Sequence, residues 1–138
     1  MKFPIKDPML VSAKVEGQHR IARELSAILD FNSPFCTILG QDAVDLGYPR
    51  AANQYSDEER DHPEETPRFT TMSGIQRGIK VKLRKVSVGS LVARNVDAVA
   101  LELEHPRFIT FDFILGRSFL KNFKMTVDMK NKFLSLSR

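Results

Sequence analysis

The chain of 138 residues has a single cysteine, Cys36, and no apolar run long enough to cross a membrane. One cysteine excludes an internal disulfide and fits a reducing compartment. The first residues carry a lysine but have no hydrophobic segment behind them, so they do not form a secretory signal. These absences predict a cytoplasmic protein with no membrane partner.

Motifs for several common chemistries are also missing. The histidines His19, His62 and His105 lack the spacing of metal ligands, and no His-Glu-x-x-His, nucleophile-elbow or phosphate-binding motif occurs. Cys36 with a histidine would form a nucleophile pair, but Cys36 sits inside an apolar run, which favours a small core residue. The sequence therefore predicts no metal and no cofactor.

The charge is only mildly unbalanced, at a formal +4. Much of the excess lies in residues 77–85, where apolar and basic residues alternate with the period of a half-buried strand. No aromatic residues are interleaved for base stacking, so a solvated strand face is favoured over a nucleic-acid-binding stripe. We therefore expect no nucleic acid partner.

The length fits one domain, residues 1–138. The hydrophobic fraction of 42% and the charged fraction of 28% are ordinary for a globular protein. Residues 55–67 differ from the rest because they are rich in acids and contain almost nothing to bury. This composition predicts a mobile acidic loop on the surface of the domain.

The remaining sequence predicts β-strands with one or two short helices. Residues 19–29 are ambiguous: Ile21, Leu25 and Ile28 have helical spacing, yet a strand returning from a turn at Gly17 fits equally well. The other expected elements are a strand over 9–15, a short helix over 42–47, a hairpin over 70–78, strands over 79–88 and 92–103, an apolar strand over 111–115, a short helix over 117–123 and a closing hairpin over 125–136.

The stretch from Ile28 to Leu39 has the most specific pattern. Two apolar residues lead into Asp30, a turn-forming Asn-Ser-Pro cluster follows Phe31, and a second apolar run begins at Phe35. An acid placed where a buried strand gives way to a turn lies beside the core, with its carboxylate held by local amides. From spacing alone, Asp30 either opens a turn or serves as a functional carboxylate.

Several segments carry motifs in a fixed order. They are a hydrophobic-hydrophobic-Asp turn over 28–38, a helix ending in Leu-Gly over 43–47, a hairpin over 69–83, Ile-Leu-Gly-Arg over 114–117 and the closing hairpin over 125–136. Together they resemble the retropepsin-like (retroviral-type) aspartic proteases, from about Val11 to the C-terminus. Each motif is weak alone, and their order and spacing carry the resemblance.

The resemblance implies a mainly β, retropepsin-like closed barrel (the acid protease fold), with the chain as a single-domain subunit of a homodimer. In that family one aspartate from each subunit faces the other across a two-fold axis, and the pair shares one proton and holds a water. The chain offers one such turn, so an active site requires two copies. The resemblance assigns the following roles: catalytic, Asp30; active-site turn, Phe31, Asn32 and Ser33; substrate-binding flap, Met72, Ser73, Gly74 and Ile75; substrate pocket, Ile114, Gly116 and Arg117.

The catalytic turn departs from the family pattern. Where the family has Asp-Thr-Gly, this chain has Asp30-Phe31-Asn32, so the hydroxyl that braces the two subunits is missing. Losing that hydrogen bond costs about 0.5–1.5 kcal/mol, whereas burying a phenylalanine contributes about 1.5–3 kcal/mol, so a dimer can survive with two Phe31 rings at its axis. Asn32 replaces a glycine and is the residue best able to copy an unusual glycine backbone. Ser33 agrees with the family, and Pro34 removes an acidic partner for Arg117.

Two functions remain open at this stage. The first is an aspartic-type endopeptidase that cleaves peptides or proteins as a homodimer. The alternative is a catalytically impaired or inactive homodimer of the same fold that binds a peptide or protein partner. Dependence of any measured activity on Asp30 separates the two.

Overall fold

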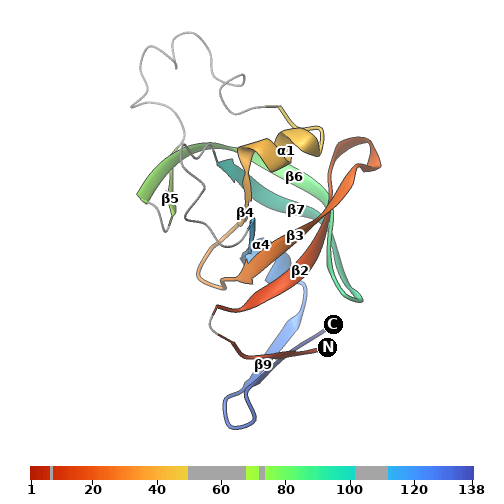
Figure 1. Ribbon diagram of the computed structural model, residues 1–138, viewed down its shortest axis with the longest axis vertical. Coiled ribbons are helices and arrows are strands. Elements are labelled where there is room, and N and C mark those ends of the chain that lie inside the picture. The colour runs from red at the N-terminus through yellow and green to blue at the C-terminus, as the bar shows by residue number, and fades with distance from the viewer. Residues whose placement is uncertain (7, 50–67, 72–73, 102–111) are drawn as a thin grey trace.

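The computed structural model describes residues 1–6, 8–49, 68–71, 74–101 and 112–138. Six strands form a closed barrel in the order β2-β3-β8-β4-β7-β6, and pairing between β2 and β6 completes the circle (Figure 1). A seventh strand, β5 (Arg68–Thr71), extends the sheet beyond β6. The expected mainly β, retropepsin-like closed barrel with one or two short helices is confirmed, and the described residues contain two short helices.

The first hairpin settles the ambiguity over residues 19–29. Strand β2 (Leu10–Glu16) pairs antiparallel with β3 (Ala22–Leu29), and a 3-10 turn, η1 (Gln18–Arg20), joins them. Leu25 and Ala27 point into the core, whereas Ile21 is largely exposed. The helical spacing therefore does not correspond to a buried face, and residues 22–29 form a strand because β2 supplies the backbone partners.

A long hairpin makes up much of the barrel wall. Strand β6 (Gly74–Val88) pairs along its length with β7 (Leu91–Leu101), and Gly89 supplies the positive φ of 57° at the connection. Lys80, Lys82 and Arg84 alternate outward, as expected for a solvated strand face. Residues 102 and 103, the predicted end of the second strand, lie outside the described part.

Two short strands and two short helices complete the barrel. Strand β4 (Cys36–Leu39) and β8 (Phe113–Leu115) lie between β3 and β7, and they carry the helices α1 (Gly40–Asp45) and α4 (Arg117–Leu120) at their ends. Helix α1 begins and ends two residues earlier than the expected 42–47, and α4 ends three residues before the expected end at 123. The core gathers inward-facing residues of every barrel strand together with α4, the largest being Phe113, Phe119, Ile38, Leu46, Leu83 and Leu115.

A second, three-stranded sheet lies below the barrel in the order β1-β10-β9 (Figure 1). It contains β1 (Lys2–Pro4), β9 (Lys124–Asp128) and β10 (Phe133–Ser137). The closing hairpin was expected, but β1 was not, because three residues that end in proline show no strand pattern. The amino group of Met1 donates to the carbonyl of Leu136 at 2.8 Å, which ties the first strand to the last.

Candidate functional site

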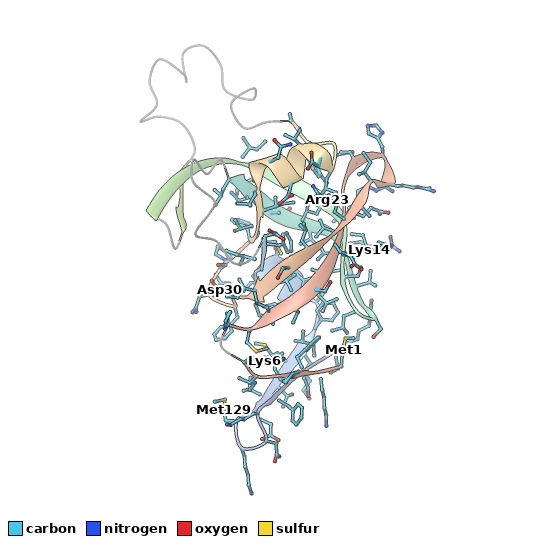
Figure 2. The ribbon with its side chains drawn as sticks, viewed as in Figure 1. Met1, Lys6, Lys14, Arg23, Asp30 and Met129 are labelled. Carbon is cyan, nitrogen blue, oxygen red and sulfur yellow. The ribbon has the colours of Figure 1, made fainter. Side chains whose placement is uncertain are left out.

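The turn between β3 and β4 contains Asp30, and the neighbouring strand holds it in place. Strand β3 runs parallel to β8, and the Asp30 N–H donates to the carbonyl of Leu115 at 3.0 Å. The Ser33 N–H then donates to the carbonyl of Asp30 at 3.2 Å, which closes a four-residue turn. The end of one barrel strand thus fixes where the aspartate sits (Figure 2).

Both oxygens of the Asp30 carboxylate accept hydrogen bonds from the turn itself. The backbone N–H of Asn32 donates to Oδ1 at 3.0 Å, and the hydroxyl of Ser33 donates to Oδ2 at 2.8 Å. The expectation that local amides hold this carboxylate is therefore met by Asn32. Ser33, which agrees with the family pattern, adds a hydroxyl donor. Because Asp30 is half-buried, these bonds orient it while one side stays open to solvent.

The two altered positions of the turn behave differently. Phe31 is 59% exposed, an unusual position for a large aromatic side chain. Asn32 is not among the non-glycine residues with positive φ, which are His19, Arg20, Asn95 and Lys132 in the described chain. Asn32 therefore does not have to copy an unusual glycine conformation, because its φ in this turn is negative and can be adopted by any residue.

The segment from Ile114 to Arg117 docks against the turn. A Cβ built at Gly116 would lie 2.1 Å from the carbonyl oxygen of Phe35 and 2.8 Å from that of Ser33, so only glycine fits. The Arg117 N–H donates to the carbonyl of Ser33 at 2.8 Å, and its side chain is exposed. Ile114 is half-buried in β8, opposite Thr37 of β4. The three motif residues therefore sit beside Asp30 mainly through the backbone.

Ser118 is a further member of this region that the sequence analysis missed. Its hydroxyl is buried, accepts the N–H of Cys36 at 3.0 Å and donates to the carbonyl of Asp97 at 2.6 Å. Burial raises the pKa of the Cys36 thiol, as expected for a core residue. The sequence feature that could have indicated Ser118 is a small hydroxyl residue directly after Gly116-Arg117, where a helix was expected to begin. Ser118 joins the strand after the turn to the helix that supports it.

The predicted flap is only partly described. Strands β5 and β6 pair antiparallel up to Thr71 and Gly74, which is the geometry of a hairpin. Met72 and Ser73 lie outside the described residues, and the side chain of Ile75 is not described. Further along β6, the Lys80 ammonium lies 4.7 Å from the centre of the Phe35 ring. This cation–π contact connects the hairpin strand to the residue just after the Asp30 turn.

A separate charged cluster joins β3 to α1. Arg23 bonds Asp42 at 3.2 Å and also Asp45, and Figure 2 shows this region at a distance from Asp30. Burial raises the pKa of Asp42; Arg23 opposes the shift, and Asp112 and Asp45 add to it. Within the described ranges no group of three or more potential ligands could hold a metal ion. No described helix is long and apolar enough to span a bilayer.

The raised pKa of Asp42 gives a pH-dependent contribution to stability. Because the folded carboxyl binds its proton more tightly than the unfolded one, it favours folding at low pH, and this advantage is lost as pH rises through the folded pKa. Asp42→Asn is expected to remove this contribution, so the unfolding free energy of the variant should fall less steeply, or rise more steeply, than that of the parent as pH increases over that range. At pH 7 it should change stability by less than about 1 kcal/mol, since Arg23 keeps Asp45. Urea unfolding at several pH values measures this, and an unchanged slope would contradict it.

The sequence and the structure of the chain were compared with those of known proteins. No family model and no curated protein sequence matches the chain. The structure is similar to a retropepsin-like aspartic protease from Rickettsia conorii, with TM-score 0.66 and 16% identity over 99% of this chain and 88% of that one. It is also similar to the retroviral protease-like domain of Ddi1 from Leishmania major, with TM-score 0.54 and 14% identity over 94% and 87%. The chain therefore has the fold of the retropepsin-like aspartic proteases.

Proposed function

We infer that the chain, as one domain, is an aspartic-type endopeptidase that acts as a homodimer, with Asp30 of each subunit forming the catalytic pair. The observation that carries this is the double anchoring of the Asp30 carboxylate by Asn32 and Ser33. Catalysis by a carboxylate pair needs placement within about 1 Å, because larger errors cost about 100-fold in rate. The two hydrogen bonds orient the carboxylate within its own turn, which supports the proposal even without the Thr-Gly of the family pattern.

The proposed reaction uses the two carboxylates with one shared proton. The ionised member takes a proton from a water held between them, and the oxygen of that water attacks the scissile carbonyl carbon. The protonated member donates a hydrogen bond to the carbonyl oxygen. Collapse of the tetrahedral intermediate then breaks the C–N bond, and the leaving nitrogen takes the proton that the first aspartate removed from the water. No group beyond the two acids and water enters this sequence.

We propose an extended peptide as the substrate. The β5–β6 hairpin is proposed as the flap that covers the peptide, with Met72, Ser73, Gly74 and Ile75 as the flap residues; Met72 and Ser73 lie outside the described residues. Ile114, Gly116 and Arg117 are proposed to border the pocket. Cys36 is a buried free thiol, which agrees with the proposed reducing, cytoplasmic location.

One observation favours a second function. Phe31 replaces the bracing hydroxyl and exposes 59% of its surface, so two rings packed at a dimer axis would move the acids apart. In that case the chain is a homodimer that binds a peptide or protein without cleaving it. The second function shares the fold and the dimer with the first and differs only in the chemistry.

Cleavage of a diverse peptide mixture between mildly acid and neutral pH tests the proposal. The purified chain is expected to cleave, and Asp30→Ala is expected to be silent. If both proteins are silent over the whole range, the endopeptidase proposal is wrong. Retention of peptides from the same mixture by the silent proteins would then support the second function.

A further inference from the structure

A row of side chains crosses the outer face of the barrel, from the Asp30 turn to strand β6. The strands that carry it lie side by side in the order β3-β8-β4-β7-β6 (Figure 1). The strand registers place each member directly opposite the next, and the members of this outer row are Ile28, Ile114, Thr37, Val99 and Lys80. Because Ile28 lies two residues before Asp30, the outer row begins beside the proposed catalytic carboxylate.

The outer row faces away from the barrel core. Successive residues of a strand point to opposite faces of the sheet. The core cluster contains the residues next to the row, among them Ala27, Phe113 and Ile38, and it contains no member of the row itself. The three members nearest Asp30 are half-buried, and Lys80 at the far end is exposed. The outer row is therefore a mainly apolar surface that ends in a positive charge.

The positive charge of Lys80 has no acid as a partner among the described residues. Lys80 lies opposite Val99, which is apolar and buried. Lys82, two residues along the same strand, lies opposite Asp97 and forms an ion pair with it at 3.6 Å. The Lys80 ammonium instead lies 4.7 Å from the centre of the Phe35 ring. Of these two lysines on one face of β6, Lys82 is neutralised within the described part of the chain and Lys80 is not.

Phe35 keeps this charge close to the proposed catalytic turn. Its carbonyl packs against Gly116, and the carbonyl of the preceding Pro34 accepts the N–H of Ser118 at 3.1 Å, so the segment that carries the ring is fixed. A cation over an aromatic ring keeps its charge, and a lysine ammonium has three N–H donors. A side chain that is already held in place loses less conformational entropy when it binds a ligand. Lys80 is therefore suited to bind a carboxylate.

We propose that Lys80 binds an acidic side chain of a peptide that lies along the outer row, so that the substrates of this site carry Glu or Asp near the scissile bond. The inference rests on the proposed function and names its substrate class. Neighbouring strands lie about 4.8 Å apart, so the row from Ile28 to Lys80 spans about 19 Å, which an extended peptide covers in about six residues. A homodimer presents the row once on each side of its axis, so an acid on either side of the scissile bond can be bound.

The half-buried members of the row favour apolar side chains between the scissile bond and the acid. Ile28 and Ile114 are neighbours across β3 and β8 and offer branched aliphatic surface, and Thr37 adds a methyl group. Apolar contacts of this kind contribute affinity, whereas the charge of Lys80 discriminates between peptides, because a basic side chain at the same place is repelled. The expected pattern is therefore apolar residues next to the scissile bond and an acid farther out.

Binding of matched peptides tests the inference without requiring cleavage. The probes are fluorescein-labelled peptides of about twelve residues, long enough to span the row on both sides, with leucines at the centre and a Glu, Gln or Lys moved along one flank. The protein is the full-length Asp30→Asn variant, which leaves the peptides intact. At one position of the series we expect Glu to bind about fivefold more tightly than Gln, and the difference to shrink at high salt. Fluorescence anisotropy measures each Kd.

Charge variants separate a contact with Lys80 from attraction to the whole protein, whose formal charge of +4 favours any acidic peptide. Added to the Asp30→Asn chain, Lys80→Gln is expected to abolish the difference between the Glu and Gln peptides. Lys80→Glu is expected to reverse it, so that the Lys peptide binds more tightly than the Gln peptide at the same position. Lys82→Gln is the matched control, because it removes the same charge from the same face and should keep the preference for Glu.

Each outcome decides the inference. Absence of binding, equal binding of Glu and Gln peptides at every position, or a preference that survives Lys80→Gln overturns it. A preference lost equally in Lys82→Gln, or one that Lys80→Glu does not reverse, also overturns it. Cleavage of the same peptides by the parent chain reports on the proposed function separately. A Lys80-dependent preference without cleavage supports this inference and rejects the endopeptidase, whereas cleavage without that preference does the reverse.

Discussion

An equimolar mixture of the parent chain and Asp30→Asn is expected to retain about one quarter of the activity of the parent alone at the same total concentration. The reason is that random pairing gives one parental dimer in four, and a dimer with one aspartate has lost either the base or the acid. Asp30→Asn alone should lose about 10²–10⁴-fold or more in kcat/KM, because an amide cannot take the proton from water. Cleavage measured after exchange of subunits gives both numbers.

Asp112→Asn serves as the matched control. Asp112 is an exposed aspartate just before β8, where its carboxylate accepts the N–H of Ser26 at 3.4 Å, outside the Asp30 turn. This variant is expected to cleave like the parent. Asp30→Asn should unfold at nearly the parent temperature, since Oδ1 can still accept from Asn32. Activity that falls in proportion to the parent fraction, instead of with its square, would mean that one aspartate suffices and that the two-carboxylate mechanism is wrong.

Gly116→Ala is expected to destabilise the fold by about 3 kcal/mol or more. The added methyl would overlap the carbonyl of Phe35 at 2.1 Å and its carbon at 2.6 Å, and both are backbone atoms. Overpacking of a well-packed site costs about 1–3 kcal/mol, and rigid backbone on both sides places this position at the upper end. The docked segments cannot separate cheaply, because the N–H groups of Arg117 and Ser118 bond the carbonyls of Ser33 and Pro34.

Gly89→Ala provides the comparison for that measurement. Gly89 has a φ of 57°, and a methyl there would meet the end of the flexible Met1 side chain, which can move aside. The remaining cost is the left-handed backbone, about 1–2 kcal/mol. Urea unfolding should therefore rank Gly116→Ala as clearly the more destabilised protein. Equal losses would show that the close packing against Phe35 is not what requires glycine at this position.

The sequence predicted the strands with alternating patterns and the order of the motifs, because burial on one face leaves a period of two in the residues. It could not decide whether residues 22–29 form a helix or a strand, since the apolar residues of this stretch, among them Leu25 and Ile28, fit both patterns. The antiparallel pairing with β2 decides it, and such pairing is a tertiary property. Strand β1 was missed for a similar reason: Lys2 to Pro4 become a strand only because β10 lies beside them.

For the candidate site, the sequence indicated Asp30 and the Gly116 motif but not how they are joined. That the Asp30 N–H would bond Leu115, or that Ser118 would bridge Cys36 and Asp97, depends on contacts between distant parts of the chain. Asn32 does not use a positive φ in the local turn of this chain, so the glycine-like backbone conformation considered for it is not needed. Residue type alone does not reveal which backbone conformation the surrounding strands impose.

The anchoring of the Asp30 turn by β8 and α4 has a consequence for the order of folding. Ser118 bonds Cys36 across 82 residues of chain, and Met1 bonds Leu136 across 135. Contacts between residues so far apart in sequence form slowly, because a long loop must close before any of them is gained. We therefore expect the hairpin of β6 and β7, which is local, to form early, and the turn around Asp30 to acquire its final geometry among the last steps. A nascent chain that ends before β8 would carry Asp30 without the geometry proposed for catalysis.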